Sequence, residues 1–176
     1  MTLAAAPAPR PLRVVIMGVS GSGKSTIGCL LADGLGLRFV EGDDLHPPRN
    51  VALMAAGTPL TDEDRRAWLD AVAAALMEAE AAGAVVSCSA LKRRYRDRLR
   101  AAAPNLRLVH LHGDSACLAQ RLRTRAGHYM PASLLPSQLA ALELPAADEH
   151  ALVADIGRPP EHIVRELRRR LESTTP

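Results

Sequence analysis

The residues with the clearest chemical purpose form a glycine-rich segment near the start of the chain. The segment consists of Gly18, Val19, Ser20, Gly21, Ser22, Gly23, Lys24, Ser25 and Thr26. It fits the pattern G-x-x-x-x-G-K-[ST], with an apolar run before it and an amphipathic run after it. Backbone N–H groups in such a loop, and at the start of the helix that follows, point at anionic oxygens. The segment therefore predicts a loop that binds the phosphates of a nucleotide.

Two side chains of this segment have specific roles in the predicted site. Lys24 is expected to bridge the β- and γ-phosphates of ATP, and the Ser25 hydroxyl is expected to bind Mg²⁺. A flexible linker of glycine and serine is the alternative interpretation. A linker has no reason to lie between a buried strand and an amphipathic helix, so we favour ATP and Mg²⁺ as cofactors.

Two carboxylates follow the next apolar segment. A short strand predicted at 38–41 runs into the sequence Gly-Asp-Asp-Leu-His-Pro at 42–47. Alternate residues of a strand point to the same side, so Glu41 and Asp43 are expected to lie together at the edge where open α/β sheets bind ligands. One of them is placed to accept a proton from a substrate hydroxyl or to hold metal-bound water. Ordinary turn carboxylates that cap the following segment are the alternative.

A long helix is predicted from Thr61, which is a suitable N-cap with Asp64 three residues later. Arg65 lies near the start of this helix, where a positive charge opposes the helix dipole. We therefore expect Arg65 to bind an anion. A salt bridge from this arginine to Asp62 or Asp64 is the alternative.

Further basic residues lie on two later helices. In the helix predicted at 91–103, Lys92 and Arg96 share a face that begins where the preceding strand opens into the site. A solvated basic surface is the interpretation that we keep for Arg93, Arg94 and Arg98 of the same helix. Arg121 and Arg125 share a face of the next helix, which a segment rich in glycine and proline interrupts. That segment suits a lid at about 121–140, which would close over phosphates and carry arginines with it.

Composition limits the class of protein. The chain has 176 residues, of which 48% are hydrophobic, and this suits one domain, predicted at 13–173, after a disordered lead-in at 1–12. The net charge of +3 is compatible with an anionic ligand but too small to argue for nucleic acid. No apolar run approaches the roughly 20 residues that cross a bilayer, so we expect no membrane partner.

The order of elements predicts the fold class. Strands expected at 13–17, 38–41, 84–89, 105–111 and 152–156 alternate with helices. This alternation predicts an α/β fold of three layers, in which helices cover both faces of a doubly wound parallel sheet of five strands. The size and layout point to a small-molecule or nucleotide kinase.

Several motifs together resemble the gluconate kinases. Besides the glycine-rich segment, they are Gly-Asp-Asp-Leu-His-Pro at 42–47, the Cys-Ser-Ala-Leu-Lys and Tyr-Arg-Asp groups within 88–97, and Gly-His-Tyr at 127–129. The resemblance runs from about residue 13 to the closing helix. It implies a P-loop fold of the nucleoside-monophosphate-kinase type and transfer of the ATP γ-phosphoryl group to the 6-hydroxyl of D-gluconate. It also implies Mg²⁺ and a homodimer in the cytosol.

The resemblance assigns roles to the candidate residues. Asp43 would orient or deprotonate the 6-hydroxyl, and Glu41 would join Ser25 at the metal. Lys24, Arg121 and Arg125 would neutralise charge on the transferred phosphoryl group. The substrate contacts would come from Asp43, His46, Arg65, Lys92, Arg96 and His128.

The chain departs from the family pattern at a few positions, and two other functions remain as alternatives. Leu53 stands where a lysine is usual, so the choice of sugar acid could differ. A kinase for shikimate or a nucleoside monophosphate is the nearest alternative. A nucleotide-dependent switch that binds nucleic acid is the second, although the chain has few aromatic residues for base stacking.

Overall fold

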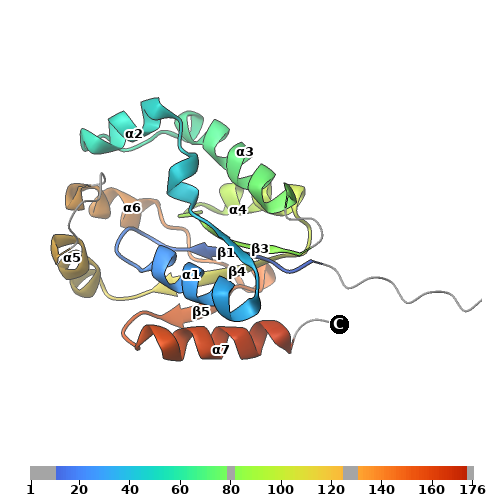
Figure 1. Cartoon of the computed structure of the whole chain (residues 1–176). Helices are drawn as coiled ribbons and strands as arrows, with labels where there is room; N and C mark the ends of the chain where they lie inside the picture. Colours follow the sequence, from blue (N-terminus) through green and yellow to red (C-terminus); the bar gives the residue numbers. More distant parts are fainter. Residues whose placement is uncertain (1–10, 79–81, 125–130, 174–176) are drawn as a thin grey trace, which may run out of the picture.

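A parallel sheet of five strands forms the centre of the computed structural model, which describes residues 11–78, 82–124 and 131–173 (Figure 1). The strands are β1 (Arg13–Met17), β2 (Arg38–Val40), β3 (Ala84–Ser87), β4 (Leu106–His112) and β5 (Leu152–Asp155). They lie in the order β2-β3-β1-β4-β5, and each pair is parallel. The glycine-rich segment thus follows the central strand.

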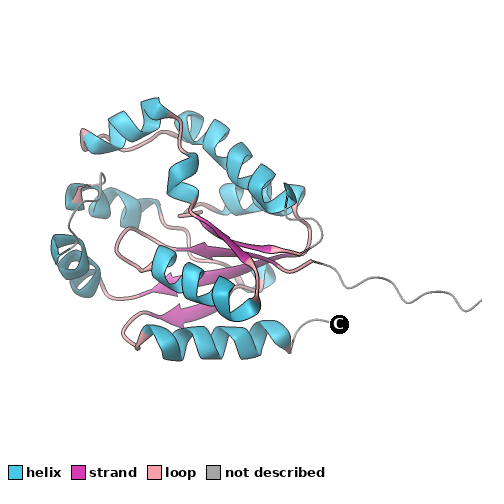
Figure 2. Ribbon diagram, in the orientation of Figure 1, coloured by secondary structure: helices cyan, strands magenta, loops and turns pink. Residues whose placement is uncertain are grey.

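Helices cover both faces of the sheet, as Figure 2 shows. The helices α1 (Lys24–Leu35) and α7 (Pro160–Glu172) pack together on one face. The helices α3 (Asp62–Glu78) and α4 (Arg93–Ala102) pack together on the other. The predicted three-layer fold class is confirmed. None of the helices described here is both long and apolar enough to cross a membrane.

The strand β1 shows why the sheet is covered on both sides. Val14 and Ile16 belong to the core shared with α1 and α7, whereas Val15 and Met17 belong to the core shared with α3 and α4. All four side chains have no exposed surface. The continuous apolar run of β1 is therefore the pattern of a central parallel strand, whose alternate side chains enter two separate cores.

Shorter helices occupy two of the connections between strands. They are η1 (Gly42–Leu45) and α2 (Pro48–Ala55) after β2, and α5 (Ser115–Thr124), η2 (Ala132–Leu134), α6 (Leu135–Ala141) and η3 (Ala147–Glu149) after β4. The predicted lid at 121–140 falls partly on residues 125–130, which lie outside the described residues.

Local sequence signals set several element boundaries. The helix expected directly after the glycine-rich segment is confirmed as α1, and its C-cap Gly36 has a left-handed backbone. Thr61 and Asp64 form the expected reciprocal hydrogen bonds at the start of α3. The strand predicted at 38–41 ends at Val40 instead, because η1 follows. The strand alternation that we expected to place Glu41 beside Asp43 is therefore wrong.

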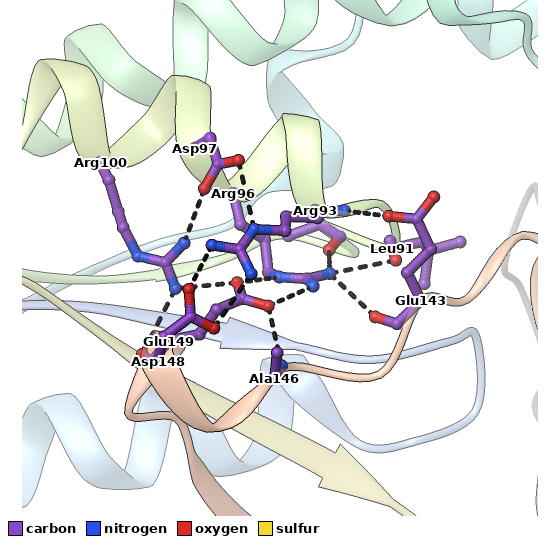
Figure 3. Close-up of polar contacts among 10 residues, drawn as sticks. Leu91, Arg93, Arg96, Asp97, Arg100, Glu143, Ala146, Asp148 and Glu149 are labelled. Atoms are coloured by element: carbon purple, nitrogen blue, oxygen red, sulfur yellow. Dashed lines mark hydrogen bonds and ion pairs between the residues drawn. The ribbon is translucent and has the colours of Figure 1, made fainter.

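A buried ion pair joins α4 to the connection before β5, as Figure 3 shows. Arg96 has no exposed surface, and its Nε and Nη2 atoms each donate a hydrogen bond of 2.7 Å to the Glu149 carboxylate. Its Nη1 atom donates to the carbonyl oxygens of Ala90, Leu91 and Glu143 at 3.0 to 3.2 Å. The hydrogen bonds from Arg96 to the carboxylate are the main reason that the pKa of Glu149 is lowered to about 2. The arrangement fixes the backbone between β3 and α4.

We expect this ion pair to be essential to stability. The substitution Glu149→Gln keeps the size of the side chain but leaves the Arg96 guanidinium buried without a counter-charge, which should lower the free energy of unfolding by about 3–5 kcal/mol. The matched control is Asp148→Asn, because Asp148 pairs with Arg93 at an exposed position and should lose much less. Urea unfolding at pH 7 measures both, and equal losses would contradict the assignment.

Candidate active site

A cavity of about 120 Å³ lies beside the glycine-rich loop at the carboxyl edge of the sheet. The polar residues that line this edge cavity are Ser20, Lys24, Asp43, His46, Arg65, Ser89, Lys92, Tyr95, Ser137 and Gln138. They come from the connections after β1, β2 and β3 and from α3, α4 and α6. Parallel strands bring these connections to one edge, so residues far apart in the sequence meet there.

The glycine-rich loop has a backbone that other residues could not adopt. Gly18 and Gly21 have φ angles of +146° and +82°, and a Cβ atom on Gly18 would lie 2.7 Å from the carbonyl oxygen of Leu111. The loop ends at Gly23, the N-cap of α1, so the first N–H groups of that helix face the loop. This geometry fits the phosphates of a nucleotide.

Side chains around the loop add further donors. Arg121 of α5 donates to the carbonyl oxygen of Ile156 at 2.8 Å, and a Cβ atom on Gly23 would lie 3.9 Å from its Nη1 atom. Arg121 therefore reaches the loop. Within the described part of the chain, the buried Ser22 hydroxyl makes no hydrogen bond. Together with Lys24 in the cavity wall, these groups provide cations and donors for an anionic ligand.

The segment after β2 is held by buried hydrogen bonds around Gly42. Its N–H group donates to the Ser87 hydroxyl at 2.9 Å, and the indole of Trp68 donates to its carbonyl oxygen at 2.7 Å. A Cβ atom on Gly42 would lie 1.9 Å from the Ser87 carbonyl oxygen, so only glycine fits. The Ser87 hydroxyl also donates to Glu41. These contacts fix the position from which Asp43 enters the cavity.

His46 forms part of the cavity wall as a neutral imidazole. Its ring stacks on Trp68, with the ring centroids 4.3 Å apart and the planes 10° from parallel. Burial lowers the pKa of His46 to about 4, although the nearby Asp43 carboxylate acts in the opposite direction. At neutral pH the imidazole can therefore both donate and accept a hydrogen bond.

Cations gather at the wall formed by α3 and α4. Lys92 precedes α4, and its Nζ atom lies 3.0 Å from the Asp62 carboxylate. Asp62 also accepts hydrogen bonds from Tyr95 and Arg94, and the hydrogen bond from Tyr95 is the main reason that its pKa is lowered to about 2. The guanidinium of Arg65 lies 5.9 Å from the centroid of the Tyr95 ring. Arg65 and Lys92 thus offer two positive charges to an acidic ligand.

The structure does not bring one predicted site residue, Arg96, to the cavity, and two others fall outside the part of the chain that it describes. The prediction that Arg96 contacts substrate is wrong, because its guanidinium is buried against Glu149 and backbone carbonyls and does not line the edge cavity. Its role is to support the backbone of Ala90 and Leu91, next to the cavity. Arg125 and His128 lie outside the described residues.

Gln138 lines the cavity, yet the sequence analysis did not identify it. It lies in α6, in a stretch without a recognisable motif. No local spacing could have shown its importance, because the residue that it contacts, Ser20, is 118 positions away in the chain.

Comparisons with known proteins identify the family of this chain. A family model described as "AAA domain" matches residues 14–145. A gluconokinase of Gluconobacter oxydans is 48% identical to this chain over 93% of each sequence. The chain belongs to the gluconokinase family. The thermoresistant gluconokinase of Escherichia coli is 45% identical over 85% of this chain and 87% of that relative. The crystal structure of a gluconokinase from Sinorhizobium meliloti has a TM-score of 0.85 and 48% identity, and the match covers 94% of both chains.

One departure from the gluconokinase pattern also lies near the cavity. Leu53 packs against an apolar cluster formed by Met54, Leu60 and Leu134. These three residues line the edge cavity. The leucine therefore lies against an apolar part of the wall, at a position where the family resemblance leads us to expect a lysine.

Two buried histidines should make stability depend on pH. Burial is the main cause that lowers the pKa of both His46 and His110 to about 4, from 6.5 in the unfolded chain. Between these values the unfolded chain binds more protons than the folded one. The free energy of unfolding should therefore fall as the pH is lowered from about 6.5 to about 4.

Urea unfolding between pH 7 and pH 4.5 measures this slope. Each of the substitutions His46→Gln and His110→Gln should reduce it, by up to about 1.4 kcal/mol per pH unit. His162→Gln on the surface of α7 is the control and should leave the slope unchanged. A wild-type stability that stays constant over this range would contradict the burial of neutral imidazoles.

Proposed function

We propose that this protein transfers the γ-phosphoryl group of ATP to the 6-hydroxyl of D-gluconate, giving 6-phospho-D-gluconate and ADP. The observation that carries this proposal is a single cavity in which the phosphate loop, a carboxylate and two cations meet. Lys24 of the loop, Asp43, Arg65 and Lys92 all line it. Relatives named gluconokinases, up to 48% identical over most of the chain, support the choice of acceptor.

ATP would bind with its phosphates in the glycine-rich loop formed by residues 18–26. The loop N–H groups and the start of α1 would hold the phosphate oxygens, and Lys24 would contact the β- and γ-phosphates. Arg121 reaches the loop at Gly23 and would neutralise charge on the transferred group. We propose the same role for Arg125.

The 6-hydroxyl of gluconate would approach Asp43, which would orient it and accept its proton. His46 would hydrogen-bond to other hydroxyls as a neutral imidazole. Arg65 and Lys92 would bind the carboxylate at the opposite end of the substrate. His128 would also contact substrate. The support for this orientation is that the cavity wall carries one acidic side chain, Asp43, from the connection after β2, and two cations, Arg65 and Lys92, from α3 and the start of α4.

Lys92 would have to share its charge with Asp62 when substrate binds. In the structure its Nζ atom lies 3.0 Å from Asp62, which also accepts hydrogen bonds from Arg94 and Tyr95. These contacts hold Lys92 in one position beside the cavity. A positioned cation loses less side-chain entropy on binding than a free one.

We propose that the site also binds a magnesium ion, because hydroxyl and carboxylate oxygens are ligands that this ion prefers. The Ser25 hydroxyl in the first turn of α1 and the Glu41 carboxylate, which Ser87 holds, would bind it directly or through water. Magnesium would neutralise charge on the β- and γ-phosphates during transfer. We also propose, from the family resemblance, that the protein is a cytosolic homodimer.

The direct test is ADP release by the purified protein with ATP and Mg²⁺. The acceptors are D-gluconate, other aldonates, shikimate and nucleoside monophosphates, with a reaction without acceptor as the control. We expect turnover with gluconate to exceed that with every other acceptor, because the named relatives are gluconokinases and the cavity offers cations for a carboxylate. Faster turnover with another acceptor would refute the proposed substrate and direct attention to the apolar wall around Leu53.

The role of Asp43 can be tested by replacing it. Asp43→Asn should lower kcat about 100-fold or more, because proton acceptance typically contributes that much, while ATP still binds. Asp44→Asn is the matched control, since Asp44 is an exposed carboxylate in the same short helix η1. Steady-state kinetics and nucleotide titration measure the two properties. Near-normal kcat in Asp43→Asn would remove this residue from the mechanism.

A further inference from the structure

One contact connects the phosphate loop to the opposite wall of the edge cavity. The backbone N–H of Ser20 donates a hydrogen bond of 2.7 Å to the Oε1 atom of Gln138. Both residues are only 8% exposed, and both line the cavity together with Lys24. The hydrogen bond therefore lies where the loop meets the space proposed for the acceptor.

The local backbone shows why Ser20 can donate in this direction. The Ser22 N–H donates to the Val19 carbonyl oxygen at 3.3 Å, and Gly21 has a φ angle of +82°. These are features of a type II turn with Ser20 and Gly21 at its centre. The N–H of Ser20 takes no part in the hydrogen bond that closes the turn, and it donates to α6 instead.

The helix α6 is a wall of the cavity as well as a partner of the loop. Besides Gln138, its residues Ser137 and Ala141 line the edge cavity. Leu135 at the start of α6 is buried in the core that also contains residues of β1 and α1. A shift between α6 and the loop would therefore change the distance between the acceptor space and the phosphates.

We propose that Gln138 is a positioning residue for phosphoryl transfer. It acts through the Ser20 backbone to fix the position of the α6 wall of the cavity relative to the phosphate loop. This inference rests on the proposed function, because it assumes that the edge cavity holds the acceptor. Misplacing a reacting group by about 1 Å can cost on the order of 10²-fold in rate, so the contact matters for turnover more than for binding.

The test is a double-mutant cycle on the full chain. Gln138→Met keeps the length of the side chain and removes the oxygen atom that accepts the hydrogen bond from Ser20. Ser20→Pro removes the N–H, and the turn should tolerate it because proline is favoured at this position of a type II turn. Ser20→Ala is its reference, since it also loses the hydroxyl but keeps the N–H. Gln120→Met, at an exposed position of α5, is the control for exchanging glutamine and should have the wild-type kcat.

We expect Gln138→Met in the Ser20→Ala background to lower kcat about 10- to 100-fold. The substitution leaves the buried N–H group unpaired and displaces the phosphoryl acceptor from the phosphates. The KM values for ATP and gluconate should change much less. In the Ser20→Pro background Gln138→Met should change kcat less than about twofold, because the backbone N–H that donates to Gln138 is already absent. Urea unfolding of each variant establishes that it is folded.

Three results would overturn the proposal. They are an equal loss of kcat in both backgrounds, an unchanged kcat in Gln138→Met, and a loss confined to KM. The starting protein is assayed alongside, so failure of gluconate as an acceptor would refute the proposed substrate separately. The cycle would then be measured with the acceptor that does turn over, and its coupling would still decide the role of Gln138.

Discussion

The parallel pairing of β1 with β3 is the constraint on which the site depends. Its register places Ile16 opposite Ser87, and the backbone N–H of Gly18 then donates to the Ser89 carbonyl oxygen at 3.3 Å. The phosphate loop is thereby fastened to the segment that leads to Lys92. Pairing of β2 with the other side of β3 brings Asp43 to the same edge. Three connections of the sheet thus meet as a direct result of strand order.

A layer of buried polar contacts behind the cavity keeps these connections in place. Trp68 and Ser87 hold Gly42, while Arg96 holds the carbonyl groups of Ala90 and Leu91. These groups do not need to touch a ligand to affect function. Unpaired polar groups in a protein interior are costly, so such a network has few alternative arrangements. The family motifs therefore contain two kinds of residue, those that line the cavity and those that hold its walls.

Much of the fold and part of the site could be predicted from the sequence, because the signals are local. The glycine pattern and the apolar periodicity identified the loop and α1. Arg96 shows where such reasoning ends, because its partner Glu149 is 53 positions away and no local pattern links them. The sequence analysis placed Arg96 at the substrate, whereas the structure buries it together with Tyr95 and Leu99. Asp43 reaches the cavity from a short helix, although we expected it to continue a strand.

The central claim is that the edge cavity receives the acceptor with its reacting hydroxyl at Asp43. A crystal structure with a non-hydrolysable ATP analogue and D-gluconate tests this most directly. The account predicts the 6-hydroxyl oxygen about 3 Å from the Asp43 carboxylate, a hydrogen-bonding distance, and the gluconate carboxylate at Arg65 and Lys92. Gluconate bound in the reverse direction, or outside the cavity, would contradict it.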